Sequence, residues 1–377
     1  MRILTHIFAF LAMVALCSSC NDKKDEPEVL AKRTIVVYMV ATNSMSGQDN
    51  TDIAEMKTAL SGYSRGDCRL ILYRVSYNQA PQLLEISSKN DIVTTATLKT
   101  YSEEQSASVT KQRFSEVMVD VKAFAPSDDY GLVLWSHAAG WANSLPKSVG
   151  ARPRYFGIDY NATMPIDSLA DAIPAGMFSF IYADACYMGG IEVAYQLRNK
   201  TRYFVGSPAE IPYDGMPYDV TIPLFFEDNV SLPKTCDKVY EYYRNSTSGV
   251  ALSIVDCAKL DALAAVCRDI HSTAKELESA ADLQYYNRAP ITSVRLFYDF
   301  GQYTRMIAGD DSLVEQFNVA LDDAVIYKIS TPSVFGISIN ADTFSGLSTS
   351  IYGTNAADND AYYETLDWYR DVILKNN

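Results

Sequence analysis

Apolar runs alternate with amphipathic stretches from about residue 33 onward, a pattern typical of strands that cross over through helices into a mostly parallel sheet. Uninterrupted apolar runs indicate strands that are buried on both faces. We expect such strands at residues 34–40, 68–75, 130–135, 177–182, 201–205 and 249–255. A further pair of runs at 82–86 and 92–95 predicts a hairpin. The predicted fold class is therefore α/β, with a mostly parallel sheet flanked by helices.

Helices are expected where apolar residues recur at three- and four-residue spacing. Between the strands, these are residues 52–60, 114–124, 168–172 and a stretch that begins near Met188. Beyond about residue 280 the pattern predicts a helix at 313–324, strands at 334–339 and 346–352, and a closing helix at 360–374. The sequence leaves open whether residues 281–377 complete the domain of residues 33–280 or form a small appended domain.

The N-terminus has the composition of an export signal. Arg2 precedes an apolar stretch at residues 3–16, which is too short to span a bilayer comfortably and is followed by small residues. The residues before Cys20 resemble a bacterial lipoprotein signal, in which this cysteine becomes the lipidated first residue of the mature chain. We therefore expect a signal peptide at 1–19 and a flexible charged tether at 20–32. The protein would then be lipid-anchored in the cell envelope, at the periplasmic or outer surface; the alternative is a simple cleaved signal and a secreted protein.

Composition excludes several classes of protein. The 377 residues, less the signal, are enough for about two domains or for one large domain with an appendage. Against 46 acidic residues the chain has 32 basic ones, a net charge of −14 with no basic block, which argues against nucleic acid or an anionic membrane surface as a partner. With three histidines and no CxxC pair, the sequence predicts no zinc-type metal site.

Two chemically reactive residues each follow directly on a predicted buried strand. His137 comes after the strand at 130–135, and Cys186 comes after the strand at 177–182. Because the carboxyl ends of parallel strands meet at one edge of a sheet, we expect both side chains over that edge. A thiol and an imidazole placed together supply a nucleophile and an acid/base. The helix expected after Cys186 would favour the thiolate through its positive end.

The residues around this cysteine resemble the clostripain family of cysteine peptidases, which have a caspase-like fold. The resemblance rests on Tyr182-Ala183-Asp184-Ala185-Cys186-Tyr187-Met188-Gly189-Gly190-Ile191-Glu192 and on Val205-Gly206-Ser207-Pro208-Ala209-Glu210-Ile211-Pro212 with Gly215. It extends from about residue 33 to 374. What it implies is a peptidase that hydrolyses peptide bonds after Arg or Lys, with His137 and Cys186 as the catalytic pair. Calcium, which some relatives need, is the only cofactor that the resemblance suggests.

Three acidic residues are candidates for binding a basic substrate side chain. Asp184 stands two residues before Cys186, so strand alternation places it on the same side as the cysteine. In relatives this aspartate faces the basic side chain of the substrate. Glu210 and Asp214 follow the strand at 201–205 and would add negative charge to the same pocket. The sequence therefore predicts a cation-binding subsite beside the nucleophile.

The chain departs from the family pattern directly after the histidine. Relatives usually carry glycine there, whereas this sequence has Ala138. If the backbone N–H of this residue belongs to the oxyanion hole, alanine can still donate it, but a positive φ would be strained. This departure keeps an alternative open, in which the chain is an inactive surface lipoprotein that binds peptides or glycans on the same scaffold. A second departure is Thr42, which stands where relatives commonly have aspartate; we assign no catalytic role to residues 41–43.

The loop between the catalytic strands is predicted to be exposed, because residues 141–155 lack any apolar periodicity. It contains basic residues that an enzyme cutting after Lys or Arg could process. Lys147 is the best site for self-cleavage, since the bond after Arg152 has proline on its leaving side. The alternative is an ordinary surface loop with scattered charge.

Overall fold

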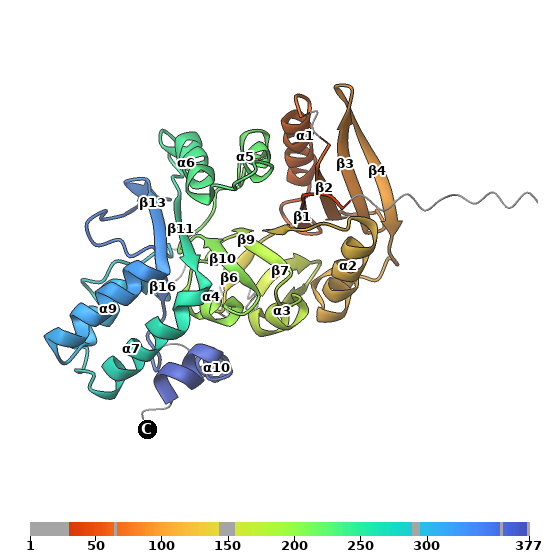
Figure 1. Cartoon of the computed structure of the whole chain (residues 1–377). Coiled ribbons are helices and arrows are strands. Elements are labelled where there is room, and N and C mark those ends of the chain that lie inside the picture. The colour runs from red at the N-terminus through yellow and green to blue at the C-terminus, as the bar shows by residue number, and fades with distance from the viewer. Residues whose placement is uncertain (1–29, 64–65, 143–154, 289–294, 355–356, 375–377) are drawn as a thin grey trace, which may run out of the picture. The chain divides into compact units, whose positions relative to one another are not determined.

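A computed structural model describes residues 30–63, 66–142, 155–288, 295–354 and 357–374 (Figure 1). The described residues from Ala31 onward belong to one compact unit. Cys20, Lys147, the predicted signal peptide and most of the predicted tether lie outside the described residues. In the part of the chain that the structure describes, no helix is both long and apolar enough to cross a membrane.

A nine-stranded mixed sheet forms the centre of the unit, in the order β13-β11-β10-β9-β5-β1-β2-β3-β4. Its five central strands are parallel neighbours: β10 (Thr201–Gly206), β9 (Phe178–Asp184), β5 (Tyr130–Trp135), β1 (Arg33–Val40) and β2 (Cys68–Val75). The flanking strands pair antiparallel: β11 (Ala251–Asp256) and β13 (Val325–Ser330) at one edge, β3 (Gln82–Lys89) and β4 (Ile92–Thr100) at the other. The α/β fold class is confirmed, with the parallel pairing confined to the centre.

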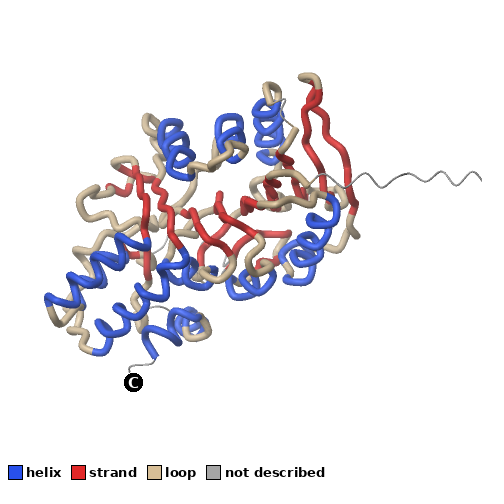
Figure 2. The backbone as a smooth tube through the Cα atoms, viewed as in Figure 1, coloured by secondary structure: helices blue, strands red, loops and turns tan. Residues whose placement is uncertain are grey.

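Helices cover both faces of this sheet (Figure 2). One face packs against α1 (Gln48–Leu60), α5 (Tyr218–Phe225) and α6 (Leu232–Tyr243). The other packs against α2 (Lys111–Phe124), α3 (Ile166–Ala172), α4 (Ile191–Leu197), α7 (Leu260–Ser272), α8 (Phe300–Ile307), α9 (Asp311–Ala324), α10 (Ala357–Tyr363) and a π-helical turn, η4 (Tyr369–Ile373). In β1 the side chains alternate between these two cores, with Val36 and Tyr38 in one and Ile35 and Val37 in the other. This two-sided burial explains why the central strands are continuous apolar runs.

A small antiparallel sheet, which the sequence does not predict, follows the histidine directly. It contains β6 (Ala138–Gly140), β7 (Tyr155–Asp159) and β8 (Ala162–Met164). The β6 strand has no hydrophobic pattern of its own, and pairing of Ala138 with Phe156 defines it. The remaining short elements are β12 (Tyr298–Asp299) with β16 (Ser348–Thr349), β14 (Ser333–Val334) with β15 (Ile337–Ser338), and the 3₁₀ turns η1 (Ala107–Val109) and η3 (Cys257–Lys259).

The C-terminal elements differ most from the sequence prediction. In place of the strand predicted at 334–339 there is a hairpin of two short strands, β14 and β15, with two residues each. The strand that joins the main sheet is β13, which follows α9 with no turn residue between them. The closing helix predicted at 360–374 is interrupted after Tyr363, where the Thr365 hydroxyl donates to the carbonyl of Tyr362 and competes with helical hydrogen bonding. Because β13 belongs to the main sheet, residues 281–377 lie in the same compact unit as the predicted catalytic domain.

A buried glutamate fastens this C-terminal segment to the helix that follows the cysteine. Glu192 in α4 is fully buried, and its Oε1 accepts from the Thr349 hydroxyl at 2.8 Å, the Ser350 N–H at 3.0 Å and the Tyr363 hydroxyl at 3.2 Å. Burial raises the pKa of Glu192 to about 7, since the charged form loses its hydration.

We predict that Glu192→Gln makes stability less dependent on pH. In the wild type the folded state keeps its proton up to about pH 7, whereas the unfolded carboxyl loses it near pH 4.3, so stability falls as pH rises between these values. Glutamine retains an acceptor for all three hydrogen bonds and cannot ionise. Urea unfolding should show Glu192→Gln gaining about 3 kcal/mol relative to wild type between pH 4 and pH 8. Tyr363→Phe is the contrasting variant: it removes a hydrogen bond that lowers the pKa of Glu192, so its loss of stability relative to wild type should grow as pH rises, opposite in sign to Glu192→Gln. An equal difference for Glu192→Gln at both ends of the pH range would contradict the prediction.

Candidate active site

The register of two adjacent strands brings the histidine and the cysteine together. In the parallel pair β5–β9, Trp135 lies opposite Asp184. His137 and Cys186 each follow two residues later, so both leave the sheet at the same height. Both line one cavity of about 250 Å³ at the carboxyl edge of the strands, together with Trp135 and Asp184.

Cys186 lies in a tight turn and not at the start of a helix. The turn places Tyr187 at φ 58°, an unusual conformation for a residue with a side chain, and α4 begins only at Ile191. The sulfur is half-buried, accepts from the Ile211 N–H at 3.3 Å and donates to the Ile211 carbonyl at 3.7 Å. Burial raises the pKa of the Cys186 thiol to about 12. The helix start that we expected next to Cys186 is not found, because α4 begins five residues later, and burial favours the protonated thiol.

His137 is held from the opposite side of the cavity. Its Nε2 lies 2.7 Å from the hydroxyl oxygen of Ser44, which belongs to the turn between β1 and α1. Its carbonyl accepts from the N–H of Gly157 in β7 at 2.9 Å. The next residue, Ala138, is buried in β6 and is not among the residues with positive φ, so alanine is accommodated without the strain that its replacement of glycine suggested.

Asp184 forms an acidic part of the cavity wall. Its Oδ2 accepts from the Met216 N–H at 3.0 Å and from the Tyr218 hydroxyl at 2.9 Å. Gly215, at φ 64°, passes so close that an added Cβ would lie 2.8 Å from this oxygen. Burial raises the pKa of Asp184 to about 6, while these two hydrogen bonds lower it. Near neutral pH this residue therefore lines the cavity as a carboxylate.

A second buried carboxyl lies behind this wall. Asp52 in α1 is fully buried; its Oδ2 accepts from the Trp135 indole N–H at 2.6 Å and its Oδ1 from the Gln48 amide at 2.8 Å. Burial, with a further contribution from the charge of Asp184, raises the pKa of Asp52 to about 8. This group is therefore neutral at pH 7 and supports the Trp135 side of the cavity through hydrogen bonds.

The other two predicted acidic residues have different surroundings. Glu210 lines the cavity, but its oxygens accept from the Arg288 guanidinium at 2.7 Å and 2.5 Å, and Oε1 also accepts from the Tyr187 hydroxyl. Asp214 is exposed and is not among the residues that line the cavity. In this structure only Asp184 presents an acidic group without a cationic partner to the cavity, among the described residues.

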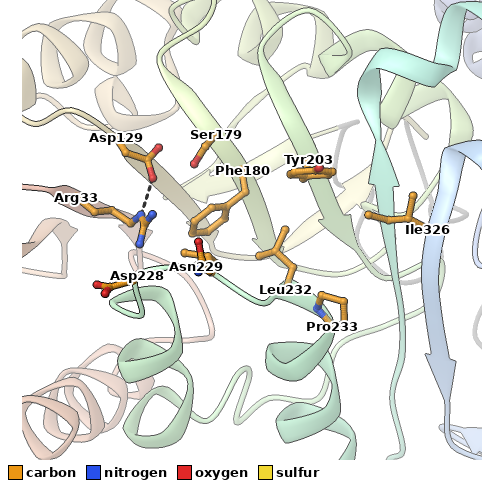
Figure 3. Close-up of a pocket in the computed structure, with 11 residues that line it drawn as sticks. Arg33, Asp129, Ser179, Phe180, Tyr203, Asp228, Asn229, Leu232, Pro233 and Ile326 are labelled. Atoms are coloured by element: carbon orange, nitrogen blue, oxygen red, sulfur yellow. Dashed lines mark hydrogen bonds and ion pairs between the residues drawn. The ribbon is translucent and has the colours of Figure 1, made fainter.

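A second hollow, of about 410 Å³, lies at the opposite edge of the central strands (Figure 3). It begins at Arg33, the first residue of β1, whose Nε donates to Asp129 Oδ2 at 2.5 Å, and it reaches Phe180 near the start of β9. Its described lining residues include no cysteine or histidine. This hollow therefore contains no cysteine–histidine pair, and within the described chain no group of three or more His, Cys, Asp or Glu side chains is placed to hold a metal ion.

Comparison with known proteins agrees with this geometry. The profile of the clostripain family matches residues 37–373. An inactive zymogen of a C11 protease from Parabacteroides distasonis superimposes with a TM-score of 0.80 at 30% identity, covering 91% of this chain and 98% of that one. A secreted C11 cysteine protease from Bacteroides thetaiotaomicron, in complex with an irreversible peptide inhibitor, gives a TM-score of 0.79 at 28% identity, covering 92% and 100%. A search of curated protein sequences finds no significant match.

The fold and the cysteine–histidine cavity define a caspase-like cysteine peptidase. The chain belongs to the clostripain family, as the resemblance of its cysteine motif indicated.

Sequence reasoning missed Ser44, Asp52 and Arg288. Ser44 and Asp52 come from the first turn and helix, and Arg288 comes from the C-terminal segment. Ser44 and Asp52 contact the lining residues His137 and Trp135, and Arg288 lines the cavity itself. These are contacts between residues far apart in the sequence, so no local motif marks them. A weak signal did exist for Asp52, because an acidic residue in a short helix beside apolar Ile53 and Met56 suggests a buried, hydrogen-bonded carboxyl.

Proposed function

We propose that this peptidase cleaves after Arg or Lys through a Cys186–His137 dyad. The observation that carries the proposal is the register of β5 and β9. Because Trp135 pairs with Asp184, His137 and Cys186 follow at the same level and line one cavity together with Asp184. In relatives of the family the corresponding motif belongs to peptidases, and one of the similar structures holds a peptide inhibitor.

The proposed reaction starts from a neutral thiol. Because burial raises the pKa of Cys186, His137 takes the thiol proton as the sulfur attacks the substrate carbonyl carbon. The negative oxygen that forms is stabilised by backbone N–H groups near Ala138 and Cys186. His137 then gives its proton to the leaving amine, and the C–N bond breaks to leave a thioester. Water, deprotonated by His137, hydrolyses this thioester and restores the thiol.

Asp184 is the residue that we propose to select a basic side chain. Its carboxylate is buried, so a charge-assisted hydrogen bond to a lysine or arginine of the substrate would be formed away from water. Glu210 contributes negative charge already balanced by Arg288, and Asp214 acts only at a distance from its exposed position. We therefore assign the larger part of the selectivity to Asp184.

The first prediction tests the dyad. Cys186→Ala should abolish hydrolysis of a peptide that ends in lysine before a fluorogenic amine, because the nucleophile is lost. His137→Ala should lower kcat by at least ~100-fold, since a neutral thiol then has no base. Initial rates and circular dichroism of both variants provide the measurement. Comparable turnover by either folded variant would reject the dyad.

The second prediction concerns Asp184 and pH. The ratio of wild-type kcat/KM for a lysine substrate to that for a matched norleucine substrate should rise up to about pH 6 as Asp184 ionises and then level off, because only the carboxylate pairs with a cation, whereas proton transfer through His137 affects both substrates alike. Asp184→Asn should remove this rise and lower kcat/KM by roughly 30-fold or more, the effect of losing about 2–5 kcal/mol from a desolvated charged pair.

Asp52→Asn is the matched control for this experiment. It also removes one buried carboxyl, but that carboxyl is neutral while Asp184 titrates and does not line the cavity. The rise near pH 6 should therefore persist in Asp52→Asn. Unchanged selectivity and pH dependence in Asp184→Asn would place the cation-binding group elsewhere.

The third prediction concerns processing and location. We propose that Lys147 is a self-cleavage site, and that Cys20 carries a lipid anchor in the cell envelope; a secreted protein is the alternative, and one relative is described as secreted. Mass spectrometry of purified wild type should then detect a fragment of residues 148–377, and Cys186→Ala should stay whole. Intact and fully active wild type would exclude processing at Lys147, and absence of a lipid mass on the mature N-terminus would exclude the anchor.

A further inference from the structure

We propose that Ser44 is a positioning residue for catalysis, which holds the His137 imidazole through Nε2 and thereby directs Nδ1 to the proton transfer. The proposal rests on the role of His137 in the dyad proposed above. Its starting point is the 2.7 Å contact between the Ser44 hydroxyl and His137 Nε2. Ser44 is 93 residues away in the sequence, in the turn that directly follows residues 41–43.

The turn that carries Ser44 is rigidly attached to the sheet. The buried Asn43 side chain donates to the carbonyls of Val40 at 3.1 Å and Ile158 at 2.8 Å, and its Oδ1 accepts from the Met45 N–H at 2.8 Å. Ser44 itself is exposed, but the residues on both sides of it are buried. Its backbone is therefore fixed by its neighbours, although its side chain remains accessible.

The residue before the histidine is hydrogen-bonded to the same two strands, β1 and β7. Ser136, the residue before His137, donates its hydroxyl to the Val40 carbonyl at 2.8 Å and accepts from the Ile158 N–H at 3.2 Å. Asn43 and Ser136 therefore both bind the end of β1 and the middle of β7. This shared attachment sets the distance between the Ser44 backbone and the His137 backbone, so the contact between their side chains is built into the fold.

The contact has a chemical consequence because the two nitrogens of imidazole are not equivalent. When Nε2 carries the proton and donates it to the Ser44 oxygen, Nδ1 has a free electron pair and can accept the thiol proton. In the other tautomer Ser44 donates to Nε2, and Nδ1 carries the proton and cannot act as a base. A third group that orients the base in this way is the general pattern of activated nucleophiles.

Ser44 also affects the charge of the histidine. The bond from Nε2–H to the serine oxygen is stronger when the ring is protonated, so removal of the hydroxyl should lower the pKa of His137. The other ionisable groups on this cavity are Asp184, Cys186, Glu210, Tyr213 and Arg288. Substitutions at position 44 leave all five in place, so a change in the pKa of His137 reports on the serine.

The experiment compares Ser44→Ala with Ser46→Ala and Ser44→Thr in the full-length protein. Ser46 is an exposed serine in the same turn, with no side-chain contact to His137 among the described residues, and is the matched control. With a lysine substrate we expect kcat to fall about 10-fold in Ser44→Ala with KM changed less than 2-fold, because the loss affects the proton transfer more than binding. Ser46→Ala should keep wild-type kinetics, and Ser44→Thr should restore most of the activity through its hydroxyl.

A second measurement does not require activity. In a Cys186→Ala background, NMR titration of histidine ring signals should show the pKa of His137 falling by about 0.5 in Ser44→Ala and remaining unchanged in Ser46→Ala. The chain has only three histidines, and burial lowers the pKa of His271 to about 4, which separates it from the others. The His137 signal is identified by its loss in His137→Ala.

The outcomes separate this proposal from the dyad. A Ser44→Ala variant with wild-type kcat overturns the positioning role, even if the pKa moves. A lower kcat with an unmoved pKa also overturns it, because the loss then has another origin. A fall in both, with rescue by threonine, supports it. If His137→Ala is fully active, the dyad itself is wrong, and the positioning role fails with it.

Discussion

The parallel pairing of β5 with β9 is the constraint on which the site depends. Trp135 lies opposite Asp184, and the two strands end together. The residues that follow the two strands, His137 and Cys186, therefore line the same cavity. Because side chains alternate along a strand, a shift of one residue in this register would turn Asp184 and Cys186 together away from the face that carries Trp135 and His137. Both strands are buried on both faces, so a slip would exchange the side chains that face the two cores and disrupt the packing of both.

Two ionisable groups of the site keep their protons in the free protein, whereas Glu210 and Arg288 form an ion pair. Burial keeps the proton on Cys186 and on Asp52 at pH 7, while Asp184 is ionised above about pH 6. The cavity wall therefore carries one unbalanced carboxylate and not two, which limits the cost of burying charge. A neutral thiol in turn requires a base, so the geometry of His137 matters more here than it would for a preformed thiolate.

Much of this architecture follows from local sequence, and the parts that do not have identifiable reasons. The five central strands and the helices α2 and α9 were predictable. Continuous apolar runs indicate buried strands, and apolar residues at helical spacing indicate the buried face of a helix. His137, Cys186 and Asp184 were predictable because strand ends are marked by the same pattern. The β6–β8 sheet and β13 were not, since pairing partners define β6 and no turn residue separates β13 from α9. Ser44 could not be found because 93 residues separate it from its partner.

The C-terminal segment completes the cavity as well as the sheet. Arg288 and Phe335 line the wall beside Cys186, and the Arg288 guanidinium lies 4.9 Å from the centre of the Phe335 ring while it pairs with Glu210. This pairing removes Glu210 as a free negative group next to the nucleophile, where its charge would oppose ionisation of the thiol. The segment also binds α4 through Glu192, which fixes the helix that follows the cysteine. A catalytic domain that ended near residue 280 would lose both contacts, which is a physical reason for the family match to continue to residue 373.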